Sequence, residues 1–91
     1  MLLEGKVALV TGAGQGVGQG IALALAAEGA RVVVTGRTLE KLEATCGLIR
    51  ERSGEAWPVV CDVKSEQSLK ECVDTTVAHF GALNGLLDNA L

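Results

Sequence analysis

The distribution of apolar residues along the chain predicts an alternation of short buried strands and longer helices. Apolar, partly β-branched runs predict strands over residues 6–11, 31–35 and 57–61, with a fourth beginning at 85. Between them lie three segments with helical patterning. The resulting order, β-α-β-α-β-α-β, predicts a parallel sheet with right-handed crossovers and helices on both faces.

The helix ends are predicted from their flanking residues. The first helix, rich in Ala and Leu, covers 18–28 and stops at Gly29. The third begins after Ser65, a suitable N-cap, and stops at Gly81. Pro58 is expected near the start of the third strand, where a missing N–H is tolerated. The second helix ends near 53–54, and its buried face is expected to contain Leu39, Leu42, Cys46 and Ile49. The buried face of the third helix is expected to contain Leu69, Cys72, Val73, Thr76, Val77 and Phe80.

Composition and charge narrow the class of protein. The 91 residues, 48% of them hydrophobic, predict one domain spanning 1–91. A net charge of −3 without runs of like charge gives no support for a nucleic-acid or membrane partner. Three cysteines outside C-x-x-C spacing are expected to be buried in a reducing compartment. No membrane span, signal peptide or metal-ligand cluster around His79 is expected, so we predict a cytoplasmic protein without a metal site.

A glycine-rich loop joins the first strand to the first helix. Gly12 permits a tight turn, Gly16 lets the backbone approach a phosphate, and Gly18 lets the helix lie close to the strand. The helix start then offers free N–H groups and a positive dipole end to a pyrophosphate. The strand–loop–helix–strand context favours nucleotide binding over an ordinary structural turn.

Several ordered motifs together resemble the short-chain dehydrogenase/reductase family. Residues 11–18 (TGAGQGVG) resemble its Thr-Gly-x-x-x-Gly-x-Gly signature, and residues 86–90 (LLDNA) resemble its Leu-Val-Asn-Asn-Ala-Gly strand. The resemblance covers the whole chain but only about the first third of a family member. It implies the N-terminal half of a Rossmann-like, doubly wound α/β fold with strand order 3-2-1-4.

The resemblance also implies roles for individual residues. Arg37 would meet the adenosine 2′-phosphate of NADP, and its bidentate guanidinium suits that role, whereas NAD-preferring sites place a carboxylate there. NADP is therefore expected rather than NAD. The alternative for Arg37 is a solvated loop cation, and for Asp62 a residue that closes a turn at the strand end. The complete set of implied cofactor-binding residues is Gly12, Ala13, Gly14, Gln15, Gly16, Val17, Gly18, Arg37, Asp62 (adenine), Val63 (backbone beside the adenine), Asp88 and Ala90 (ribose).

The sequence departs from the family pattern in three places. Gln15 stands where NADP-using relatives often carry a basic residue, and Leu91 replaces a Gly. Asp88 replaces an Asn said to tie the central strands together, and a carboxylate cannot donate hydrogen bonds as an amide can. The family's Tyr-x-x-x-Lys motif is missing, because the chain contains no Tyr. No catalytic residue is therefore assigned.

Three functions remain open from the sequence. The first is the NADP(H)-binding portion of an oxidoreductase that interconverts a carbonyl and an alcohol, not catalytic by itself. The second is a freestanding, non-catalytic dinucleotide-binding or interaction module, and the third is a half domain that folds but binds nothing. In all three, the outer edge of the fourth strand would be unpaired and one sheet face would carry only the third helix, which predicts a homo-oligomer, a strand-swapped assembly or poor solubility.

Overall fold

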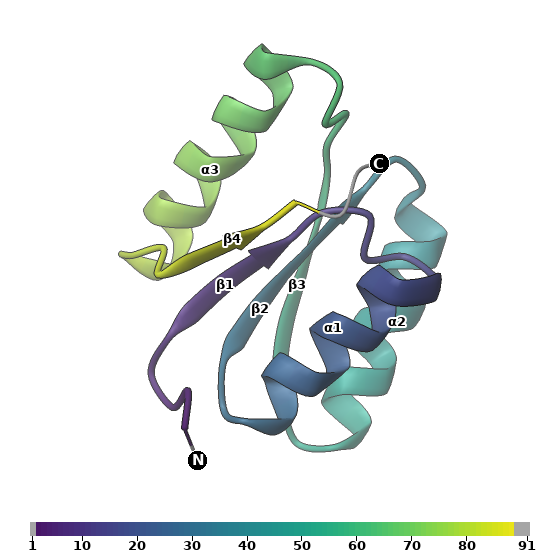
Figure 1. Ribbon diagram of the computed structural model, residues 1–91, viewed down its shortest axis with the longest axis vertical. Helices are drawn as coiled ribbons and strands as arrows, with labels where there is room; N and C mark the ends of the chain where they lie inside the picture. Colours follow the sequence, from purple (N-terminus) through teal and green to yellow (C-terminus); the bar gives the residue numbers. More distant parts are fainter. Residues whose placement is uncertain (1, 89–91) are drawn as a thin grey trace.

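The computed structural model describes residues 2–88, which form a parallel sheet between two helical layers (Figure 1). The elements are β1 (Val7–Val10), α1 (Gly16–Ala27), β2 (Arg31–Gly36), α2 (Leu39–Glu51), β3 (Glu55–Val60), α3 (Glu66–Phe80) and β4 (Gly85–Leu87). The four strands lie in the order β3-β2-β1-β4, and every pairing is parallel. The predicted fold class, element order and strand order are confirmed.

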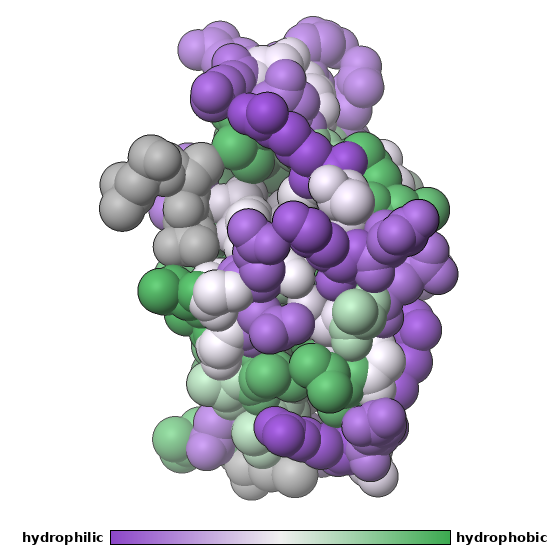
Figure 2. Space-filling view, turned by 90° about the vertical axis from the view of Figure 1, so that its right-hand side faces the viewer, coloured by the Kyte–Doolittle hydropathy of each residue, from purple (hydrophilic) through white to green (hydrophobic). Residues whose placement is uncertain are grey.

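The central strands β1 and β2 are buried on both faces, because successive side chains of a strand point to opposite sides. Val10, Val32 and Val34 pack beneath α1 and α2. Leu9 and Val33 pack on the other face, beneath α3. Figure 2 views the side that carries α1 and α2, where hydrophilic residues cover most of the surface and hydrophobic residues form smaller groups. None of the helices within residues 2–88 is long and apolar enough to cross a membrane.

The buried faces of α2 and α3 were predicted correctly except for one residue in each helix. Leu39 is 47% exposed and Val77 is 43% exposed, although both were expected to be buried. Leu39 is the first residue of α2, at the exposed start of the helix. Thr45, which the pattern omitted, is fully buried in α2. α1 also begins at Gly16 rather than 18, since the first helical hydrogen bond runs from Gln19 N–H to the carbonyl of Gln15 (3.3 Å).

Pro58 lies inside β3 rather than near its start. The strand spans Glu55–Val60, earlier than the predicted 57–61, and Pro58 is paired with Val34 of β2. β3 is the edge strand of the sheet that residues 2–88 form, with β2 as its neighbour. A proline is tolerated there because its missing N–H can face away from the ladder. The position of β3 at the edge of the sheet therefore explains how a proline can lie in the middle of this strand.

The caps of α3 agree with the sequence. The hydroxyl of Ser65 accepts a hydrogen bond from Ser68 N–H (3.2 Å) at the start of the helix. Gly81 ends the helix in the left-handed conformation (φ 82°), and its N–H donates to the carbonyl of Val77 (2.7 Å). The chain then returns to β4, so these two residues fix the length of the third crossover.

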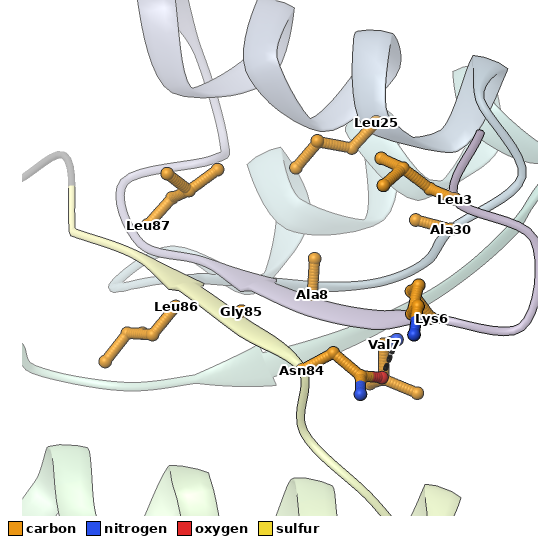
Figure 3. Close-up of a pocket in the computed structure, with 10 residues that line it drawn as sticks. All are labelled: Leu3, Lys6, Val7, Ala8, Leu25, Ala30, Asn84, Gly85, Leu86 and Leu87. Atoms are coloured by element: carbon orange, nitrogen blue, oxygen red, sulfur yellow. Dashed lines mark hydrogen bonds between the residues drawn. The ribbon is translucent and has the colours of Figure 1, made fainter.

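An apolar groove of about 470 Å³ runs along β1 and β4 on the side where α1 ends (Figure 3). Leu3, Leu25 and Leu87 lie along one side of it, and Leu86 lies on the other side of β4. At its lower end, Asn84 Oδ1 accepts a hydrogen bond from Val7 N–H (2.8 Å). Within residues 2–88 the sheet offers β4 a neighbour on one side only, which leaves Leu86 45% and Leu87 41% exposed.

The three cysteines are buried, as predicted. Burial raises the pKa of Cys72 to about 12, with a contribution from the neighbouring Cys61 thiol. Burial also raises the pKa of Cys46. Because the thiolate is the reactive form, these thiols are chemically protected in the folded state.

We expect iodoacetamide at about pH 8 to modify Cys72 roughly 1,000-fold or more slowly in the native chain than in denaturing urea. Cys46 should also be protected in the native chain. Mass spectrometry of tryptic peptides after timed quenching would measure both rates. Equal rates with and without urea would contradict the packing of α2 and α3 described above.

Candidate functional site

The loop between β1 and α1 is shaped by two glycines in the left-handed conformation. Gly12 and Gly16 both have φ near +60°. At this φ a side chain is strained, so the loop requires glycine on conformational grounds. An added Cβ at Gly16 would meet nothing within 4 Å, which leaves the space in front of it open to a ligand. Gly18 is buried in the first turns of α1.

Ala13 anchors the loop rather than facing outward from it. It is fully buried, and its N–H donates to the carbonyl of Thr35 in β2 (3.0 Å). Its own carbonyl accepts from the hydroxyl of Thr45 in α2 (2.9 Å). The same hydroxyl accepts from Gln19 Nε2 (3.0 Å). Thr45 was not predicted from the sequence, although it lies three residues after Leu42 and so shares its helical face.

The N-terminus of α1 points its free N–H groups toward this loop. Gln15 is the N-cap, and its side chain forms no capping hydrogen bond. The first turn contains no acidic residue. By contrast, α3 is capped by a Ser65 side chain and has Glu66 in its first turn. The start of α1 is therefore the one of these two helix starts that is electrostatically suited to an anion.

A cleft of about 210 Å³ opens between the glycine loop, the end of β2 and the start of α2. Arg37 and Lys41 both line it, and both are exposed. The residues that line it are Gly12, Gly14, Gln15, Gly36, Arg37, Thr38, Lys41 and Leu42, which include no carboxylate. Lys41 Nζ donates to Gln15 Oε1 across the cleft wall (2.7 Å). Sequence reasoning did not identify Lys41.

Asp62 closes a turn after β3, as its structural interpretation predicted. One carboxylate oxygen, Oδ1, accepts from Lys64 N–H (3.0 Å), and its carbonyl accepts from Ser65 N–H (3.0 Å). The Asp62 N–H donates to Ser68 Oγ (3.0 Å). The side chain of Val63 packs against the core beneath α3, which leaves only its backbone for a ligand. The adenine-binding role of this pair stays a prediction.

The end of β4 is tied to the end of β1 through Asp88. Thr11 Oγ1 donates to Asp88 Oδ1 (2.9 Å), and Thr11 N–H donates to the carbonyl of Leu87 (3.0 Å). Because Thr11 supplies the proton, a carboxylate serves in this bond where an amide oxygen could. The replacement of Asn by Asp88 therefore preserves this link between the strands. Ala90 lies outside the described residues.

The glycine loop, Arg37, Asp62 and Asp88 all lie at the carboxyl-terminal end of the sheet. Parallel strands place their carboxyl ends together, so the residues that follow β1, β2, β3 and β4 share that edge (Figure 1). The strand order reverses between β1 and β4, and ligands of doubly wound sheets bind at such a switch point. The glycine loop lies there and Arg37 flanks it.

We expect Thr45→Val to destabilise the folded chain, because the buried carbonyl of Ala13 would lose its hydrogen-bond donor. The free energy of unfolding should fall by about 1–3 kcal/mol. Urea unfolding followed by circular dichroism would measure it. Thr75→Val, on the exposed side of α3, is the matched control and should change the stability by less than about 0.5 kcal/mol. Equal effects of the two substitutions would refute the anchoring role.

Comparison with known proteins shows which family the chain resembles. The family model described as short chain dehydrogenase matches residues 6–90. The mouse protein named dehydrogenase/reductase SDR family member 1 is 43% identical over 89 residues, which are 97% of this chain and 28% of that protein. The 7alpha-hydroxysteroid dehydrogenase of Escherichia coli K12 is 36% identical over 97% of this chain and 34% of its own length.

Solved structures give the same result. A crystal structure of hydroxysteroid dehydrogenase from Escherichia coli superimposes on 98% of this chain with a TM-score of 0.94 and 36% identity, and the match covers 38% of that protein. A metagenomic short-chain oxidoreductase crystallised in complex with NADP gives a TM-score of 0.90 at 38% identity, over 94% of this chain and 39% of that one. The chain thus spans about a third of the length of these relatives.

Proposed function

Because this chain belongs to the short-chain dehydrogenase/reductase family, we propose that it is the NADP(H)-binding part of an oxidoreductase that interconverts a carbonyl and an alcohol. One observation carries the choice of cofactor. The cleft beside the glycine loop has Arg37 at its rim and no carboxylate among its lining residues. A site for NAD would need a carboxylate at the end of β2 to accept from the free 2′-hydroxyl.

The described residues suit a dinucleotide. The uncapped N–H groups at the start of α1 would hold the pyrophosphate, and the open space at Gly16 would admit it. Arg37 would hold the 2′-phosphate through its planar fork of donors. Asp62 would accept from the adenine amino group, while Asp88 and Ala90 would line the ribose. When bound, the nicotinamide cofactor supplies or accepts the hydride.

Proton transfer would require residues beyond these 91. The family uses a Tyr and a Lys in a Tyr-x-x-x-Lys motif, and this sequence contains no Tyr. The proposed role of the 91 residues is therefore to bind and orient the cofactor, and we propose that they do not turn over substrate alone. A structure of a relative with NADP supports the choice of cofactor by analogy.

Calorimetric titration of the 91-residue chain with NADPH and NADH tests the proposal. We expect tighter binding of NADPH. Arg37→Glu should weaken NADPH by about 10–100-fold, since it removes a charge-assisted contact to the phosphate and adds a repelling carboxylate. NADH binding should be unchanged or improved, because the new carboxylate can accept from the 2′-hydroxyl.

Arg52→Glu is the matched control for that titration. Arg52 is an exposed arginine at the other end of α2, away from the cleft, and its charge reversal alters the net charge equally. It should leave the NADPH-to-NADH ratio within about twofold of wild type. Binding of neither cofactor, or a preference for NADH, would exclude an NADP site in this chain.

We also propose that the chain associates with a second copy through the outer edge of β4. An unpaired strand edge presents N–H and C=O groups to any other strand, and Leu86 and Leu87 add exposed apolar surface beside it. The neighbouring apolar groove extends this surface toward α1. Charges on an edge strand oppose such pairing.

Sedimentation velocity should therefore show species larger than a monomer for the wild-type chain, and Leu86→Lys should shift them toward the monomer. Val60→Lys places the same charge on the opposite edge strand, at a residue that is 54% exposed, and should leave the distribution unchanged. A wild-type chain that sediments as a monomer across concentrations would disprove association at this edge.

A further inference from the structure

Lys41 and Gln15 are 26 residues apart in the sequence but touch at the mouth of the cleft. Lys41 Nζ lies 2.7 Å from Gln15 Oε1. Both residues line the cleft that Arg37 borders. A cation that extends from α2 therefore occupies the position beside the glycine loop that a longer basic side chain at residue 15 would reach.

Close packing of α2 on the glycine loop puts Lys41 there. An added Cβ at Gly14 would lie 2.9 Å from the Cβ of Lys41, so the loop can approach the helix this closely only with glycine at position 14. A Cβ at Gly36, at the end of β2, would meet Leu42 Cδ2 at 3.1 Å, which is a tight contact with the same helix. The bond from Thr45 to Ala13 holds the next turn of α2 in place. The backbone of Lys41 is thus fixed relative to the loop.

The charges around the cleft leave both cations available to an anion. Within residues 2–88, neither Arg37 nor Lys41 forms an ion pair, since the salt bridge found there joins Arg31 to Glu55. The contact of Lys41 with Gln15 is to a neutral amide oxygen. A phosphate monoester carries a charge of about −1.5 to −2 at pH 7. A single guanidinium, with one positive charge, neutralises only part of it.

We infer that Lys41 is a second cation for the cofactor's 2′-phosphate and, together with Arg37, sets the preference for NADP over NAD. This inference rests on the proposed function. Arg37 contributes a planar fork of donors, whereas Lys41 contributes a compact charge on a flexible stem. Gln15 holds the ammonium at the cleft in the absence of the phosphate.

The test compares dissociation constants for NADPH and NADH by calorimetry. Lys41→Met should weaken NADPH by about tenfold and leave NADH unchanged, which is the loss expected for one charge-assisted contact in a solvent-open cleft. The double variant Lys41→Met with Gln15→Arg should recover the preference, because it restores a cation at the same point. Lys70→Met, on the exposed side of α3, removes an equal charge and should leave the ratio unchanged.

The outcomes separate this inference from the proposed function. If Arg37→Glu abolishes the preference for NADPH but Lys41→Met leaves it intact, the proposed NADP-binding function is supported and the role of Lys41 is refuted. If Lys41→Met weakens NADPH and NADH equally, Lys41 acts through the structure of the loop, and the inference also fails. A wild-type chain without preference for NADPH refutes the proposed function, and the inference with it.

Discussion

The backbone of Ala13 is hydrogen-bonded to two different elements, and the position of the glycine loop depends on this. Its N–H bonds to Thr35 at the end of β2, and its carbonyl bonds to Thr45 in α2. The loop leaves β1 through Gly12, whose positive φ allows many directions. The two bonds to Ala13 select one of them, and they are buried, where an unmade hydrogen bond is costly.

Once the loop is held, small residues determine what can lie beside it. Gly14 has no side chain where α2 crosses, so Lys41 approaches to a distance that a Cβ would prevent, and a Cβ at Gly36 would crowd Leu42. The helix then forms one wall of the cleft, and Lys41 lines the cleft together with Arg37. The electrostatic character of the cleft follows from this packing, since Gln15 contributes no charge of its own.

The β4 end of the site is held differently, by side chains that reach between strands. Asn84 Oδ1 accepts from Val7 N–H before the strand, and Asp88 Oδ1 accepts from Thr11 Oγ1 after it. These bonds bracket a strand that pairs with β1 alone in the described part of the chain. The switch point between β1 and β4 is therefore formed, although the outer edge of β4 remains open.

The sequence alone determined the order of the elements, the glycine loop and the position of Arg37, because these depend on local periodicity and on motifs with fixed spacing. The sheet order followed from the resemblance to a known family. The sequence could not reveal Lys41 or Thr45, which meet the loop only after α2 packs across it. It misplaced Pro58 near the start of the third strand, because that strand begins at Glu55, two residues earlier than the pattern predicted. Such contacts join residues about 25 or more positions apart, and only the tertiary structure decides which side chains meet over that separation.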